Sequence, residues 1–201
     1  MISIELVFYL MTLLFGGIGA IRGWQKEVIA MAGLVGSIAF LHSFGPGLVQ
    51  YGSLGLAFFS AGDVSAARQA FWVQFLFHIV VAFFSYQVIG SIATRAPGTR
   101  NERAREGFQN MFIGFVIGVF NGYLLFGTLW SFLENQITPD GYIPLPDGQP
   151  YVFGPLVQRA VTETIFLDMV NYLPLSLFGF GSGVWLLFFF ISFFIVIIAL
   201  I

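Results

Sequence analysis

Two long apolar runs flank residues 19–27, which read GAIRGWQKE. Charged residues make up only 9% of the chain and hydrophobic residues 58%, so glycine and charge gathered between two apolar runs need a physical reason. A hydrocarbon layer of about 30 Å is crossed by about 20 apolar residues in a helix. Both runs have that length, at about residues 3–21 and 27–48. The stretch therefore predicts a tight helical hairpin in a membrane.

Three more apolar runs of similar length follow, at about residues 70–93, 108–133 and 176–201. The sequence thus predicts an all-α fold, a polytopic transmembrane helix bundle with five spans. Gly45-Pro46-Gly47 is predicted to end the second span, because proline interrupts a helix. The first run opens with Glu5 instead of the basic residues of a signal peptide, so we expect it to be retained as a span.

Composition and motifs argue against several classes of function. The formal net charge of −2 disfavours nucleic-acid binding, which needs a basic surface. The absence of cysteine excludes disulfides, thiolate metal sites and cysteine nucleophiles. No Ser/His/Asp arrangement, HExxH motif or phosphate-binding loop is present. We therefore expect a protein that is not an enzyme.

Lysine and arginine lie mainly in two of the four connections between the predicted spans. The first connection holds Arg22 and Lys26, whereas the second and fourth hold only Arg68 and Arg159. The third carries Arg95, Arg100, Arg103 and Arg105. The positive-inside rule predicts that the first and third connections are cytoplasmic, with the N-terminus outside and the C-terminus inside.

The predicted outer segment, residues 134–174, has two parts. Residues 138–155 contain five prolines, so we expect an extended loop without regular structure. From Val157 to Tyr172 apolar residues recur at helical spacing, with polar residues such as Arg159 opposite. This pattern predicts an amphipathic helix that ends at Pro174 and lies either on the outer membrane surface or on the bundle itself.

Gly114, Gly118 and Gly122 recur every fourth residue on one face of the fourth span, and we call them the glycine ladder. Small residues allow close helix approach in lipid, where hydrophobicity contributes little to helix association. The ladder is expected to receive another helix of the same chain. The candidates are the first span with Gly16 and Gly19 and the second with Gly33 and Gly36, and a homodimer seam is the alternative.

His78 lies inside the third span, and an ionisable residue at membrane depth is a candidate functional residue. One interpretation is a haem or chlorophyll ligand that binds through a ring nitrogen. The other is a hydrogen-bonded packing residue, which a single intramembrane histidine more often is. No neighbouring histidine or carboxylate is spaced to form a metal site, and no cofactor is expected unless the chain belongs to a pigment-bearing complex.

The charges of the opening stretch also allow two interpretations. Arg22 and Lys26 can act as topology determinants at the cytosolic interface. Alternatively, Arg22 or Glu27 reaches into the bundle and pairs with a polar group such as Asn121, which lies between two glycines of the ladder. We expect the second arrangement to stabilise helix packing in preference to forming a transport site.

The order of these features resembles the colicin V production protein family. The motif Gly19-x-x-Arg22-Gly23-x-x-x-Glu27 carries most of the resemblance, followed by the glycine ladder with Asn121. A proline-marked segment and a short amphipathic helix extend it over residues 1–174. Members of that family typically have four spans, so residues 175–201 are interpreted as an additional C-terminal transmembrane helix.

This resemblance implies a bacterial inner-membrane protein linked to colicin V production, a form of toxin biosynthesis, and to envelope physiology. It implies no catalytic residues. Our first hypothesis is a non-enzymatic protein that scaffolds or assists a secretion or envelope process, with membrane lipids and either other membrane proteins or a second copy as partners. An accessory subunit of an energy-transducing or photosynthetic complex is the second hypothesis. The third is a small transporter or channel.

Overall fold

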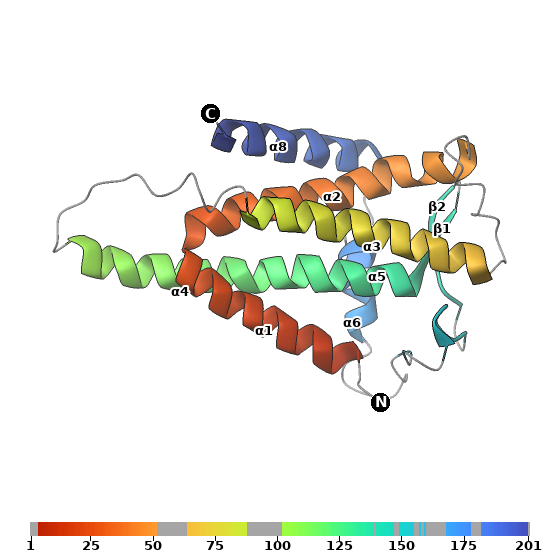
Figure 1. Cartoon of the computed structure of the whole chain (residues 1–201), viewed down its shortest axis with the longest axis horizontal. Coiled ribbons are helices and arrows are strands. Elements are labelled where there is room, and N and C mark those ends of the chain that lie inside the picture. The colour runs from red at the N-terminus through yellow and green to blue at the C-terminus, as the bar shows by residue number, and fades with distance from the viewer. Residues whose placement is uncertain are drawn as a thin grey trace.

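The structure, a computed structural model, describes residues 4–51, 64–87, 102–138, 140–146, 149–154, 157, 159, 168–177 and 182–200. Helices dominate this part of the chain, which confirms the predicted all-α fold (Figure 1). In chain order, the elements are α1 (Ile4–Arg22), α2 (Trp24–Tyr51), α3 (Val64–Gln87), α4 (Glu102–Gly122), the π-helical turn η2 (Tyr123–Gly127), α5 (Thr128–Glu134), β1 (Asn135–Thr138), β2 (Gly141–Pro144), α6 (Asp168–Asn171), α7 (Pro174–Leu177) and α8 (Ser182–Leu200).

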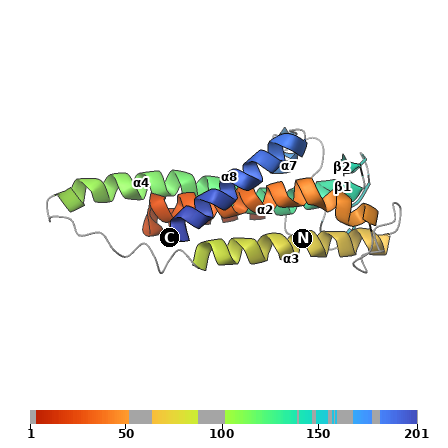
Figure 2. The ribbon, with the colours of Figure 1, turned by 90° about the horizontal axis from the view of Figure 1, so that it is seen from above.

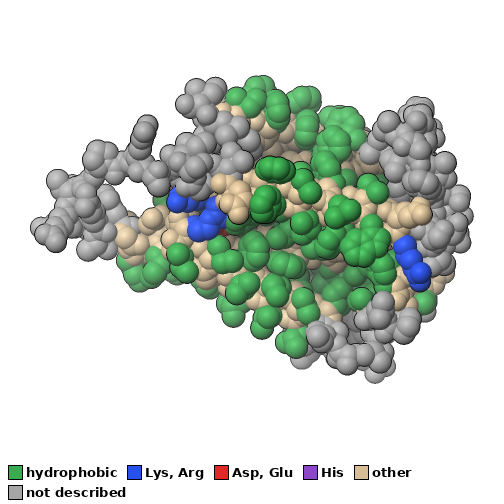
Figure 3. All heavy atoms as spheres, in the orientation of Figure 1, with side chains coloured by type: hydrophobic (Ala, Val, Ile, Leu, Met, Phe, Trp, Pro, Cys, Tyr) green, Lys and Arg blue, Asp and Glu red, His purple; other side chains and the backbone are tan. Residues whose placement is uncertain are grey.

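Four helices are long and apolar enough to cross a membrane, and they match the first four predicted spans. They are Ile4–Arg22, Trp24–Gly47, Ala67–Gln87 and Gly107–Glu134, the last of which runs through α4, η2 and α5. On the face in Figure 3, Lys and Arg side chains lie at the two ends and hydrophobic side chains cover the area between them. This distribution is typical of a membrane-spanning surface, and the chain is a multi-pass membrane protein.

Helix α8 occupies the fifth predicted span. It has 19 residues, and none of them is charged. Helix α2 is the centre of the bundle, since it contacts α3, α4 and α8. In Figure 2, α2 lies between α3 and α4, and α8 crosses it obliquely.

The glycine ladder is covered by α1. A Cβ on Gly19 would overlap the carbonyl oxygen of Gly114, and a Cβ on Gly122 would lie 2.8 Å from the Cα of Thr12. Backbone therefore packs directly on backbone, which is the geometry that small residues permit in lipid. The two candidate glycines of α2 face other helices, because Gly33 meets Ser85 of α3 and Gly36 meets Ser192 of α8. Of the candidate partners, the structure selects the first span.

The prediction that α2 ends at Gly45-Pro46-Gly47 is wrong. The helix continues to Tyr51 with Pro46 inside it. Membrane helices tolerate proline because neighbouring elements help satisfy the freed backbone groups. Here both strands pack on α2, and a Cβ on Gly45 would lie only 2.7 Å from Cδ1 of Ile137. The last turns of α2 are thus packed against strands β1 and β2.

The expectation of an irregular segment over residues 138–155 is also wrong in part. Strands β1 and β2 form an antiparallel hairpin in which Thr138 pairs with Gly141. Gly141 has φ +129°, a conformation that favours glycine, and the Thr138 hydroxyl donates to its carbonyl at 2.8 Å. Pro144 stands at the other end of β2, opposite Asn135, where a proline does not interrupt the ladder.

The predicted amphipathic helix over residues 157–172 is not continuous. Val157 and Arg159 are outside any helix, and residues 160–167 lie outside the described part of the chain. Among the residues of this stretch that the structure describes, helix is present at Asp168–Asn171. Pro174 opens α7 instead of ending the preceding helix, which agrees with the preference for proline at the first helical position.

Candidate functional site

Glu27 is the centre of a polar network at the end of the bundle where α1 meets α2. Its side chain is completely buried. Arg22 Nη1 donates to Oε1 at 3.0 Å, while the Tyr86 hydroxyl and Asn121 Nδ2 donate to Oε2 at 3.0 and 2.8 Å. Both carboxylate oxygens are therefore hydrogen-bonded, which a buried charge requires.

The Glu27 network joins all four long spans. Arg22 ends α1, Glu27 lies in the first turn of α2, Tyr86 lies near the end of α3, and Asn121 lies near the end of α4. Arg22 Nη2 also donates to the Tyr86 carbonyl at 3.0 Å, and the guanidinium carbon lies 4.4 Å from the centroid of the Tyr86 ring. Asn121 Nδ2 donates in addition to the Glu27 carbonyl at 2.9 Å. One cluster thus fixes the relative positions of four helices.

The turn at Gly23 brings Arg22 and Glu27 together. Gly23 has φ +84°, which glycine adopts without strain, and its N–H donates to the Gly19 carbonyl at 2.9 Å. A side chain at this position would also collide with Asn110 of α4. Asn110 Oδ1 accepts a hydrogen bond from the Trp24 N–H at 3.1 Å and so caps the start of α2.

A second buried carboxylate, Glu134, organises the opposite end of the bundle. Arg159 donates to Oε2 through Nε at 3.1 Å, and its Nη2 forms an ion pair with Oε2 at 3.0 Å. The Tyr151 hydroxyl donates to Oε1 and accepts a hydrogen bond from Trp130 Nε1 at 3.0 Å. Glu134, Tyr151 and Trp130 are all at most 3% exposed. We call these four residues the Glu134 network.

Arg159 and Tyr151 hold the segment that follows β2 against the end of α5 through hydrogen bonds. The Arg159 guanidinium donates to the carbonyls of Leu145 at 3.0 Å, Pro146 at 2.6 Å and Gln149 at 3.4 Å. Burial, together with the hydrogen bond to Glu134 and its charge, raises the pKa of the Tyr151 phenol well above its usual value. Tyr151 therefore remains a hydrogen-bond donor at all physiological pH values.

His78 lies in the bundle interior with no exposed surface. Its Nδ1 is 2.5 Å from the Ser37 Oγ, whose own proton is donated to the Leu34 carbonyl at 2.8 Å. Nδ1 is therefore engaged by Ser37, and Nε2 has no hydrogen-bond partner by distance and angle among the described residues. The Phe132 ring packs edge-on against the imidazole at 6.1 Å. A haem or chlorophyll would have to displace packed helices to reach Nε2, so the arrangement fits a packing residue better than a ligand.

Sequence reasoning found one of the two carboxylate networks. The structure brings together Arg22, Glu27 and Asn121 as the motif indicates, but Tyr86 was missed. Glu134 and Arg159 were assigned to the outer segment without a partner, and the structure pairs them, with the Glu134 side chain buried. The available signal was a carboxylate directly after an apolar run, with only one arginine in the otherwise acidic segment that follows.

The two networks hold helices and chain segments together. Within the described residues, no group of three or more His, Asp or Glu side chains is arranged to hold a metal ion. The carboxylate oxygens of Glu27 and Glu134 are occupied by donors of the chain itself, whereas Asn121 Oδ1 has no hydrogen-bond partner among those residues.

Comparisons with known protein families, with characterised proteins and with solved structures found no match. The resemblance to the colicin V production family therefore depends on the motif residues alone. It stays a prediction.

Proposed function

We propose that this chain is a non-enzymatic protein of the bacterial inner membrane that scaffolds a secretion or envelope process, as its resemblance to the colicin V production family implies. The observation that carries this proposal is the closed network around Glu27. Arg22 and Glu27, the residues that carry most of the resemblance, are bound to other spans of the chain. Residues engaged in this way stabilise a fixed bundle, which is what a scaffold requires.

The proposed orientation has the Glu27 network on the cytosolic side. The α1–α2 connection lies at the same end of the bundle as the end of α3 and the start of α4 (Figure 1). Arg22 and Lys26 belong to this end, and the positive-inside rule favours a cytosolic position for it. The hairpin and the Glu134 network would then face the outside.

The burial of the polar residues argues against the transport alternative. A transport path needs ionisable groups that face a passage, and Glu27, Asn121 and His78 are each completely buried. A buried ion pair that loses one partner leaves an uncompensated charge, which costs about 3–5 kcal/mol. The proposal therefore predicts that changes at this network lower stability and do not alter a flux.

The first test measures function in cells that lack their own colicin V production protein. The wild-type chain is expected to restore production of the toxin, and Glu27→Gln is expected to restore it poorly because the bundle is weakened. Lys26→Gln is the matched control, since it removes a charge from the same connection and Lys26 is not a partner of Glu27. Failure of the wild-type chain, in a host where it inserts normally, would contradict the proposed role.

A second measurement separates the structural role from transport. Thermal unfolding in detergent should show large losses for Arg22→Met and Glu27→Gln, and the double variant should be no worse than the poorer single variant, because the two residues act as a pair. Reconstituted in liposomes, folded Glu27→Gln should give the same proton and ion flux as the wild-type protein. A changed flux would support the transport hypothesis instead.

A further inference from the structure

A groove opens between α3 and α8 on the surface of the bundle, with α2 as its floor. Both helices pack on α2, and α8 crosses α2 obliquely (Figure 2). The residues that line the groove come from all three helices. Its volume is about 170 Å³. The floor is made by small residues of α2, and the walls are mainly aromatic. The lining residues are Ala32, Gly33, Gly36, Ser37, Phe40, Phe77, Val81, Phe189, Ser192 and Phe193.

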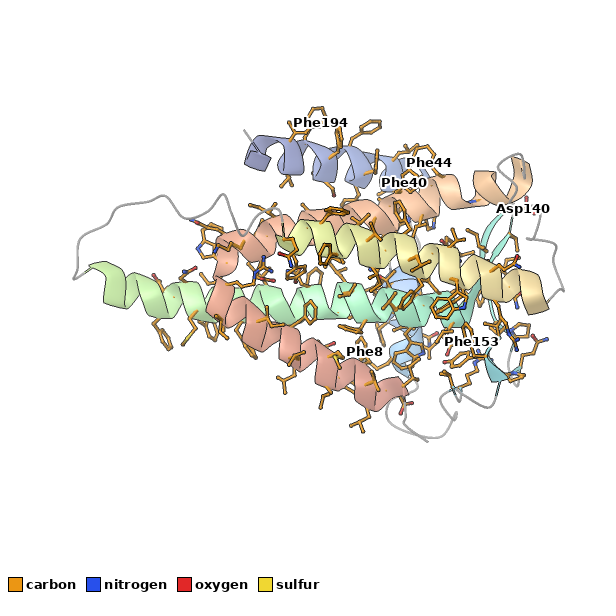
Figure 4. All side chains as sticks on the ribbon, in the orientation of Figure 1. Phe8, Phe40, Phe44, Asp140, Phe153 and Phe194 are labelled. Carbon is orange, nitrogen blue, oxygen red and sulfur yellow. The ribbon has the colours of Figure 1, made fainter. Side chains whose placement is uncertain are left out.

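The aromatic walls are held in place by contacts with one another. Phe40 of α2 stacks on Phe77 of α3 with a centroid distance of 4.9 Å, and it meets Phe189 of α8 at 6.0 Å. Phe189 in turn stacks on Phe193 at 6.3 Å. Figure 4 shows Phe40 on the side of α2 that faces α8, whereas Phe194 points away from the bundle. These contacts keep the groove open, since collapse would break the stacking.

The lining excludes polar ligands. None of the lining residues is charged. Two hydroxyls belong to the lining, those of Ser37 and Ser192, and that of Ser37 is already engaged by the Leu34 carbonyl and by His78 Nδ1. Apolar cavities of similar size, about 150 Å³, stay dry and bind small hydrocarbons. A ligand of this groove must therefore be a hydrocarbon.

The volume also decides between a lipid chain and a protein helix. A helix with its side chains is about 10–12 Å wide and cannot enter a space of this size. A single aliphatic chain can, and the mouth of the groove lies between two apolar helices of a membrane protein. Next to the mouth, Val80 of α3 and Phe190 of α8 are about half exposed, so the surrounding surface also faces lipid.

We propose that this groove is a specific binding site for one acyl chain of a membrane phospholipid. The chain lies against the glycine and alanine floor of α2 and between the aromatic walls. The lipid headgroup stays outside, because the lining offers it no charge. This site differs from ordinary lipid contact in being saturable, since the groove has room for a segment of only one chain.

The test uses the full-length protein in liposomes that contain a phosphatidylglycerol with a photoreactive diazirine in one acyl chain. After irradiation, peptide mass spectrometry maps the labelled residues. Val81→Trp fills the groove from the α3 wall, and Val80→Trp is the matched control because Val80 faces outward one residue earlier. Labelling of Phe77 and Phe189 should fall at least fivefold in Val81→Trp and remain unchanged in Val80→Trp.

If Val81→Trp does not fold, a titration of the wild-type protein with probe lipid gives an independent test. Labelling of the groove residues should saturate as the fraction of probe lipid rises, whereas labelling of Val80 and Phe84 on the outer face of α3 should rise linearly. Equal, unsaturable labelling of both sets would overturn the proposal. So would protection of the groove by a second copy, seen as a dimer in mild detergent with no label on the groove residues.

Discussion

At the scale of single residues, Glu27 and Glu134 are buried carboxylates with similar partners at opposite ends of the bundle. Each is a buried carboxylate that accepts hydrogen bonds from one arginine and one tyrosine. Burying a carboxylate costs several kcal/mol, and only a paired and fully hydrogen-bonded geometry offsets this cost. Each arginine also donates to backbone carbonyls, so each pair positions the chain as well as neutralising a charge.

The Tyr151 phenol makes the stability of the Glu134 network depend on pH. Its pKa is raised above the usual value of about 10, so the unfolded chain loses this proton first. The stabilising contribution is therefore complete below about pH 10 and decreases as the pH rises further. Tyr151→Phe should lose about 1–3 kcal/mol at pH 8, because Trp130 and Glu134 each lose a partner.

Thermal unfolding in detergent between pH 7 and 11 tests this expectation. The difference in Tm between wild type and Tyr151→Phe should stay constant from pH 7 to about pH 9 and should shrink above about pH 10. Tyr172→Phe is the control, since the Tyr172 side chain is exposed and only its carbonyl accepts a hydrogen bond. A Tm difference that grows above pH 10 would contradict the assigned direction of the pKa.

The two networks differ in how well the sequence predicts them. Arg22 and Glu27 flank a glycine turn, and Asn121 belongs to the glycine ladder, so local spacing brings them to one end of the bundle. Glu134 and Arg159 are 25 residues apart along the chain and are separated by the β1–β2 hairpin and the segment that follows it. Sequence periodicity carries no information about such a contact, because the path of that segment depends on tertiary hydrogen bonds.

At the scale of elements, the α1–α4 contact depends on glycine at specific positions. A side chain at Gly19 would overlap the Gly114 backbone, whereas one at Gly17 would enter open space. Gly19→Ala should therefore lose roughly 1–3 kcal/mol through overpacking. Gly17→Ala should be neutral or gain about 0.5–1 kcal/mol from helix propensity.

Denaturation of the two glycine variants in mixed micelles, followed by circular dichroism, measures this difference. Because both substitutions add one methyl group to the same helix, a general effect on helix formation would appear equally in both. Equal stability of Gly19→Ala and Gly17→Ala would show that α1 does not pack on the ladder as closely as the structure has it.

The sequence predicts least well those elements whose structure depends on contacts with other parts of the chain. The length of the four apolar runs depends only on the membrane, and three of them were predicted to within a few residues at both ends. The third, predicted at 70–93, begins earlier, at Val64, and residues 88–93 lie outside the described part of the chain. Pro46 was interpreted as a helix end, but α2 continues past it and packs against strands β1 and β2. The β1–β2 hairpin was missed because the prolines of this segment were taken as a sign of irregular structure. Their positions in the strand pairing were not considered.

At the scale of the whole molecule, the bundle has two chemically different ends. The Glu27 network and Gln25 belong to one end, and the hairpin turn with Asp140 belongs to the other (Figures 1 and 4). If the spans cross the membrane, a reagent that cannot cross it should reach only one end from each side. The positive-inside rule assigns the Gln25 end to the cytosol.

Single cysteines test this assignment without background, because the chain contains no cysteine of its own. Gln25 and Asp140 are both exposed, so Gln25→Cys and Asp140→Cys should each be accessible to a maleimide. In intact spheroplasts an impermeant maleimide should label Asp140→Cys within minutes and should label Gln25→Cys only after the membrane is opened. The reverse pattern would invert the orientation and leave the bundle intact, since the two ends would still lie on opposite sides. Labelling of both variants in intact spheroplasts would contradict the membrane-spanning arrangement itself, because no sealed bilayer would then separate the two ends.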